Sequence, residues 1–174
     1  METFTEILKI ILPALLVMLT AWLVIRNMLR DDQERRRQDL LLQTVKTITP
    51  VRLQAYERVV LFLERISPES LIIRTARPEM TAPQLQSALV TAVRSEYEHN
   101  LSQQIYMSNE AWEMVKNARG TIVRLVNSVA SQLPPAATGE ELSRLLLEEL
   151  VEMDTEPTKA AIAYIKSELA RIMG

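Results

Sequence analysis

The sequence opens with an apolar run that is followed at once by arginines. Residues Ile10–Ile25 carry no charge, and Lys9 is the only charged residue back to Ile7. A lysine near the end of a helix can extend its ammonium group to the lipid headgroups. About 19 helical residues nearly cross a hydrocarbon layer of about 30 Å. We therefore expect residues 1–25 to form a transmembrane anchor.

The positive charges beside this run predict its orientation. Its C-terminal flank holds five arginines, whereas Lys9 is the only basic residue on the N-terminal side. Basic residues stay on the cytoplasmic side of a membrane. The N-terminus is thus expected outside and the rest of the chain in the cytoplasm, at the inner membrane, with the flank in contact with membrane lipid. The flanking arginines are Arg26, Arg30, Arg35, Arg36 and Arg37.

Two other interpretations of the run stay open. A signal peptide needs a basic start and a small-residue cleavage site, but Met1–Glu6 is acidic and no Ala-x-Ala pattern follows. A buried helix of a soluble protein is the second alternative, since Lys9 and Pro13 interrupt the start of the run.

Composition predicts an all-α protein. The chain has no cysteine and three glycines, and the hairpin dipeptides Asn-Gly and Asp-Gly are absent. Residues 26–49 are rich in charges spaced four apart, which favours a helical stalk, with a flexible linker as the alternative. Residues 50–174 are long enough for one domain with its own core, expected to be a bundle of about five helices.

Apolar spacing and capping residues place these helices. A strong amphipathic pattern covers residues 51–66, after Pro50, which we expect to end the preceding apolar segment. Further helices are expected over residues 81–107, 108–133, 138–153 and 155–172, and the third of these should open with a Thr138–Glu141 capping box. Leu71–Ile73 is a short apolar segment that could be a strand.

Charge is distributed unevenly along the chain. Residues 26–46 hold six basic and four acidic residues, whereas residues 140–171 hold four basic and eight acidic ones. The basic part would lie beside anionic lipid, and the acidic part would be available to a protein partner. This small positive excess argues against nucleic-acid binding.

The best candidate site is a polar stripe on the helix expected over residues 81–107. On a helical wheel Val93, Tyr97, Leu101 and Ile105 form an apolar arc, and polar residues lie within it or beside it. The stripe is either a buried network that fixes helix register or a binding site for a partner or small ligand. Its residues are Glu96, His99, Asn100, Gln103, Gln104 and Tyr106.

Catalytic patterns are not found in the sequence. Glu96 and His99 have the Glu-x-x-His spacing of di-iron bundles, but the chain has one histidine and cannot supply a second motif. Nucleophile triads would also need His99, and no phosphate-binding loop occurs. We expect no catalytic residue, no metal and no other cofactor.

Three segments carry a resemblance to a known family. Leu53–Ile66, Glu96–Tyr106 and Ser108–Glu113 resemble a family of uncharacterised bacterial single-pass membrane proteins of this length. The resemblance implies a bacterial cytoplasmic-membrane protein with a helical domain, and it implies no activity.

The function that we expect is non-enzymatic. An adaptor or scaffold would hold an unknown protein partner at the inner face of the membrane. One alternative is an enzyme that uses a small ligand or a metal at Glu96 and His99. The other is a structural membrane protein that assembles with copies of itself, since a homo-oligomer is compatible with this sequence.

Overall fold

The computed structural model describes residues 15–26, 28 and 48–173. Contacts within the chain define two compact units, Met1–Thr49 and Pro50–Gly174. In the first unit residues 15–26 are helical, and the guanidinium carbon of Arg26 lies 5.1 Å from the ring centroid of Trp22. The first residues of the apolar run and most of the expected stalk lie outside the described residues, as do Arg30, Arg35, Arg36 and Arg37.

No helix within residues 15–26, 28 and 48–173 is both long enough and apolar enough to cross a membrane.

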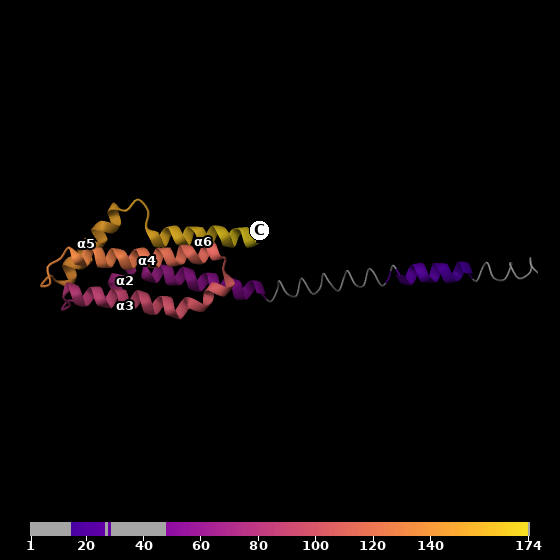
Figure 1. Cartoon of the computed structure of the whole chain (residues 1–174), viewed down its shortest axis with the longest axis horizontal. Coiled ribbons are helices and arrows are strands. Elements are labelled where there is room, and N and C mark those ends of the chain that lie inside the picture. The colour runs from indigo at the N-terminus through magenta and orange to yellow at the C-terminus, as the bar shows by residue number, and fades with distance from the viewer. Residues whose placement is uncertain (1–14, 27, 29–47, 174) are drawn as a thin grey trace, which may run out of the picture. The chain divides into compact units, whose positions relative to one another are not determined.

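The second unit is helical throughout its regular structure (Figure 1). Residues 48–66 form its first helix, which begins before the boundary between the two units. In the described residues the only β-type pairing is an isolated bridge between Thr81 and Thr138. The predicted all-α class and helical bundle are therefore confirmed. The remaining elements are α2 (Pro68–Thr75), α3 (Ala82–Asn100), the 3₁₀ helix η1 (Leu101–Tyr106), α4 (Asn109–Ser131), α5 (Gly139–Glu152) and α6 (Pro157–Met173).

Capping residues begin several helices where the sequence predicted. The Ser108 hydroxyl accepts the Ala111 N–H at 3.0 Å and begins α4. Thr138 and Glu141 form the predicted capping box, in which the Thr138 N–H donates to the Glu141 carboxylate at 2.8 Å. These bonds satisfy N–H groups that have no partner inside the helix.

Two local expectations differ from the structure. Leu71–Ile73 lies in α2 and not in a strand, because Pro68 suits the first turn of a helix and Leu71 can then pack inward. Pro50 was expected to end the apolar segment before it, but Thr49 and Pro50 are helical and the helix continues to residue 66.

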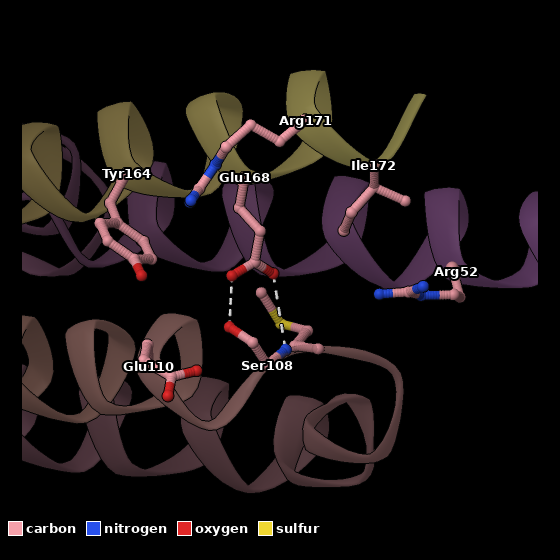
Figure 2. Close-up of a pocket in the computed structure, with 8 residues that line it drawn as sticks. Arg52, Ser108, Glu110, Tyr164, Glu168, Arg171 and Ile172 are labelled. Carbon is pink, nitrogen blue, oxygen red and sulfur yellow. Dashed lines mark hydrogen bonds between the residues drawn. The ribbon is translucent and has the colours of Figure 1, made fainter. Parts of the chain in front are cut away.

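The last helix, α6, lies along α4 (Figure 1). Glu168 on α6 faces Ser108, the N-cap residue of α4, so that the C-terminal part of α6 is fixed to the start of α4 (Figure 2).

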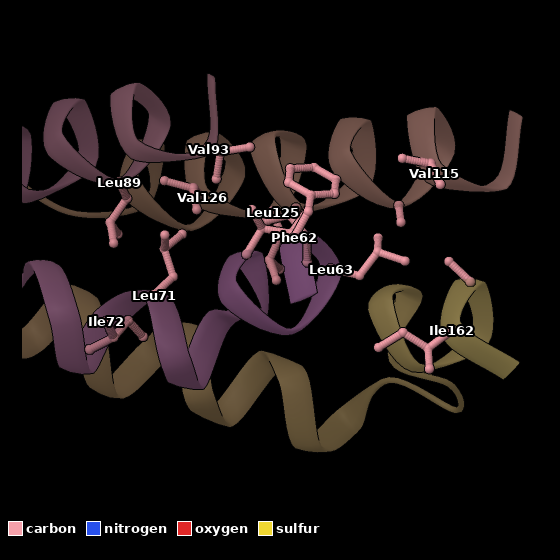
Figure 3. Close-up of a cluster of buried hydrophobic side chains, with 14 of the residues drawn as sticks. Phe62, Leu63, Leu71, Ile72, Leu89, Val93, Val115, Leu125, Val126 and Ile162 are labelled. Atoms are coloured by element: carbon pink, nitrogen blue, oxygen red, sulfur yellow. The ribbon is translucent and has the colours of Figure 1, made fainter. Parts of the chain in front are cut away.

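Apolar side chains from the helix over residues 48–66 and from α2, α3, α4, α5 and α6 meet in one core. Figure 3 shows part of this core. Phe62 and Leu63 come from the first helix of the unit and are at most 1% exposed. Burying apolar area of this kind is the main stabilising contribution to such a fold. Labelled core residues are Phe62, Leu63, Leu71, Ile72, Leu89, Val93, Val115, Leu125, Val126 and Ile162.

Candidate functional site

The predicted polar stripe begins with Glu96, whose carboxylate joins three helices. Its Oε1 accepts from Arg65 Nε at 2.7 Å and lies 3.3 Å from Arg74 Nη1. Arg74 also donates to the backbone carbonyl of Arg65 at 2.7 Å. Arg65, Arg74 and Glu96 lie on the helix over residues 48–66, on α2 and on α3. The cluster therefore ties these helices together.

His99 and Asn100 bond within their own helix. The Nδ1 atom of His99 lies 3.0 Å from the Ser95 carbonyl, and the ring is exposed. The Asn100 side chain donates to the Glu96 carbonyl at 2.8 Å and is half-buried. Both contacts span four residues, so they report local helix geometry and no link to another element.

The rest of the stripe does not follow the expected helical wheel. The α-helix ends at Asn100 and η1 continues as a 3₁₀ helix. Because a 3₁₀ helix turns about 120° per residue, side chains rotate away from the α-helical phase. Ile105 is consequently 72% exposed. Gln104 is exposed as well, although the wheel placed it inside the apolar arc.

The structure does not gather the stripe around one point. Gln103 donates to the Ser102 hydroxyl at 3.3 Å, and the Tyr106 carbonyl accepts from Arg52 Nε at 3.1 Å. Whether a partner recognises Glu96, His99, Asn100, Gln103, Gln104 and Tyr106 stays a prediction.

A buried polar cluster that the sequence did not suggest lies around Glu168 (Figure 2). Its two carboxylate oxygens accept from the hydroxyl groups of Tyr56 and Ser108. The Ser108 N–H lies 3.5 Å from Oε1. Glu168 and Tyr56 are 6% and 1% exposed. The cluster joins three helices: the one over residues 48–66, α6, and the N-terminal end of α4.

This environment shifts two pKa values in opposite directions. Burial raises the pKa of Tyr56 to about 12, and the hydrogen bond to the negative Glu168 carboxylate adds to the shift. Burial alone would raise the pKa of Glu168, but the bonds from Ser108 and Tyr56 outweigh it and hold the pKa below its usual value. Glu168 is therefore the charged acceptor and Tyr56 its neutral donor.

An open groove of about 470 Å³ runs beside this cluster. Arg52 and Arg171 contribute cations, Glu110 and Glu168 contribute anions, and the groove therefore favours no charge sign. Since both oxygens of Glu168 already accept hydrogen bonds, the carboxylate is poorly placed to act as a base. Among the described residues no group of three or more histidine, cysteine, aspartate or glutamate residues could hold a metal.

One signal in the sequence could have identified Glu168. It lies three residues after Ile165 and four before Ile172, and so borders the apolar stripe of α6. A carboxylate beside a buried stripe needs donors. Ser108 and Tyr56 are 60 and 112 residues away in sequence, so spacing alone cannot name them as the donors.

A second surface feature lies on α5. Leu142 and Leu146 face the core, whereas Leu147 is 38% and Val151 86% exposed. Leu147 and Val151 are four residues apart on one side of the helix. Together with Arg144, Glu148 and Glu152 they line an open groove of about 410 Å³, which we call the α5 groove.

Comparison with known proteins gives one match. A model described as a family of unknown function, DUF7935, matches residues 2–172 of the chain. No curated protein and no solved structure shows a match. The expected resemblance to an uncharacterised family is thereby confirmed. The match itself does not indicate a bacterial source or a membrane location.

Proposed function

Because the chain belongs to DUF7935, a family of unknown function, we propose its role from its own chemistry: a non-enzymatic adaptor tethered to the inner face of the cytoplasmic membrane. The tether would be the apolar run Ile10–Ile25, and the five arginines that follow it would keep the bundle in the cytoplasm. The bundle would present a docking surface to a protein partner.

The observation that carries the adaptor role is the α5 groove. Val151 is 86% exposed beside Leu147, on a helix whose opposite face packs into the core. Single exposed apolar residues are common on proteins, whereas contiguous apolar patches mark interaction surfaces. Leu147 and Val151 are adjacent on one face of α5 and line the same groove. The groove is open, and an apolar side chain of a partner could cover both residues.

The polar residues of the bundle favour an adaptor over an enzyme. The Glu96 carboxylate accepts from Arg65 and Arg74, and His99 bonds to its own helix, so neither presents the hydrogen-bond geometry of a catalytic pair. Among the described residues every buried side-chain nitrogen and oxygen has a hydrogen-bond partner. These groups therefore stabilise the fold.

A reporter fused after Gly174 tests the tether. Activity on the cytoplasmic side alone is expected, and replacing the five flanking arginines by neutral residues should give mixed orientations. Activity of the unaltered fusion outside the membrane would overturn the proposed location.

Chemical crosslinking in intact cells tests the adaptor role. A partner should co-purify with the native chain in defined amount, and Val151→Lys should remove it. Ile73→Lys is the matched control, because Ile73 is 75% exposed on α2. Recovery of the same proteins with both variants, or of no protein with the native chain, would contradict the adaptor role.

A further inference from the structure

The α5 groove has a distinct charge environment. Residues Gly139–Glu152 contain five glutamates and one arginine. Glu141 takes part in the capping box, and Glu148 pairs with Arg144 at 2.7 Å. Among the described residues, the Arg144–Glu148 pair is the one ion pair that α5 makes. No described cation therefore neutralises Glu149 or Glu152. Of the α5 carboxylates, Glu148 and Glu152 line the groove beside the exposed Leu147 and Val151, and Glu152 has no described cation as its partner.

The position of these carboxylates within α5 increases the effect. Glu149 and Glu152 lie in the last turn, and this turn holds no basic residue. The C-terminal end of a helix carries a partial negative charge, so that carboxylates there are unfavourable and cations are favourable. A cation supplied by a partner would offset this unfavourable placement of negative charge. The last turn of α5 has no cation of its own.

We propose that the α5 groove docks an amphipathic helix of a partner protein, with large aliphatic residues on one face and lysine or arginine beside them. The proposal rests on the adaptor function given above. The aliphatic residues would cover Leu147 and Val151, which lie at the helical spacing of four residues. The basic residues would lie against Glu148 and Glu152, the two carboxylates that line the groove.

Charge also selects among the possible occupants of the groove. A second copy of the chain placed on α5 would bring two sets of the same glutamates together, and like charges at an interface are unfavourable. An anionic lipid surface would be repelled for the same reason. A basic helix satisfies both the apolar and the charged parts of the surface.

Two synthetic peptides of one amphipathic pattern test the proposal, one built of leucine and lysine and the other of leucine and glutamate. Binding to the full chain in a non-ionic detergent is measured by fluorescence anisotropy, with empty micelles subtracted. The lysine peptide should bind at least about tenfold more tightly than the glutamate peptide. Added salt should weaken its binding, because exposed charge pairs are screened.

Variants of the chain locate the peptide. Val151→Lys should weaken binding of the lysine peptide about tenfold, whereas Ile73→Lys should change it less than about twofold. Both residues are more than two-thirds exposed, so the fold should tolerate either change, and circular dichroism checks this. Glu152→Gln should reduce the salt dependence, because Glu152 lines the groove.

Three results would overturn the proposal. The two peptides could bind equally, or Val151→Lys and Ile73→Lys could weaken binding alike. Sedimentation could also show a dimer of the full chain that Val151→Lys dissociates, which would make a second copy the occupant. If crosslinking still recovers a partner that depends on Val151, the adaptor role stands and only the basic chemistry of the partner is wrong. If no such partner exists, the adaptor role itself fails.

Discussion

At the scale of single residues, Glu168 shows what a sequence can and cannot predict. A helix was predicted to begin at Ser108 or Asn109. Ser108 caps it, and the Ser108 hydroxyl also donates to Glu168. Tyr56 lies in the amphipathic segment predicted over residues 51–66, and its hydroxyl donates to the same carboxylate. Helical periodicity predicts which face of a helix is buried. It does not predict which buried polar groups from distant segments meet.

Removing the Tyr56 hydroxyl should destabilise the bundle. In Tyr56→Phe the buried Glu168 carboxylate loses one of its donors, which should lower the free energy of unfolding by about 1–3 kcal/mol. Tyr164→Phe is the matched control, because Tyr164 lines the same groove and its hydroxyl bonds to none of the described residues. Denaturant unfolding compares the two variants, and equal losses would contradict the role given to Tyr56.

Because of the Tyr56–Glu168 cluster, the free energy of unfolding should fall at both acidic and alkaline pH. Folding raises the pKa of Tyr56 from 10.0 to about 12, so its contribution is complete below pH 10.0 and is lost as pH rises through about 12. Folding lowers the pKa of Glu168 from 4.5, so its contribution is complete above pH 4.5 and is lost as pH falls through the lowered pKa.

Unfolding midpoints measured across pH check both parts. Tyr56→Phe should flatten the alkaline loss of stability, and Glu168→Gln should flatten the acid loss. An alkaline profile that Tyr56→Phe leaves unchanged would show that Tyr56 titrates as it does in the unfolded chain.

At the scale of elements, local patterns were sufficient for most helices and failed where the helix type changes. The capping box at Thr138 and the N-cap at Ser108 identify two helix starts from residue types alone. The 3₁₀ geometry of η1 has no comparable signal. An α-helical wheel carried through Asn100 therefore misplaced Gln104 and Ile105. Leu53 lies in the amphipathic segment predicted over residues 51–66, and it is nevertheless 41% exposed.

Two glycines should respond to alanine in opposite ways. A Cβ at Gly120 would lie 3.3 Å from the flexible tip of Arg124, so Gly120→Ala should raise the free energy of unfolding by about 0.5–1 kcal/mol through higher helix propensity. A Cβ at Gly139 would lie 2.9 Å from the Met80 carbonyl, which also accepts the Gly139 N–H at 2.7 Å. Gly139→Ala should therefore lower the free energy of unfolding by about 1–3 kcal/mol.

Thermal or denaturant unfolding of both alanine variants tests this difference. A stabilised Gly139→Ala would mean that α5 can move away from Met80, and it would contradict the close contact between them.

At the scale of the whole molecule, composition alone predicted the all-α class, because few glycines and no hairpin signals leave helices as the main option. The described core residues begin at Tyr56, inside the unit Pro50–Gly174. The α5 groove was not predicted. The charge distribution indicated that the acidic C-terminal part could bind a partner, but it did not indicate which apolar residues lie beside these charges.

A fragment of residues 50–174 should fold without the rest of the chain. Since the described apolar core lies within it, the fragment should be soluble and mostly helical by circular dichroism. An aggregated fragment with weak helicity would mean that residues 40–48 belong to the core. The full chain in detergent supplies the reference helicity.

The most direct test of a membrane-tethered adaptor places a photo-crosslinking amino acid at position 151 of the full chain in living cells. We predict a discrete adduct with another protein in the membrane fraction, and the same adduct in the soluble fraction when residues 1–25 are removed. A probe at position 73 should give no such adduct. No adduct at position 151, or an adduct whose fraction does not depend on residues 1–25, would contradict the proposed function.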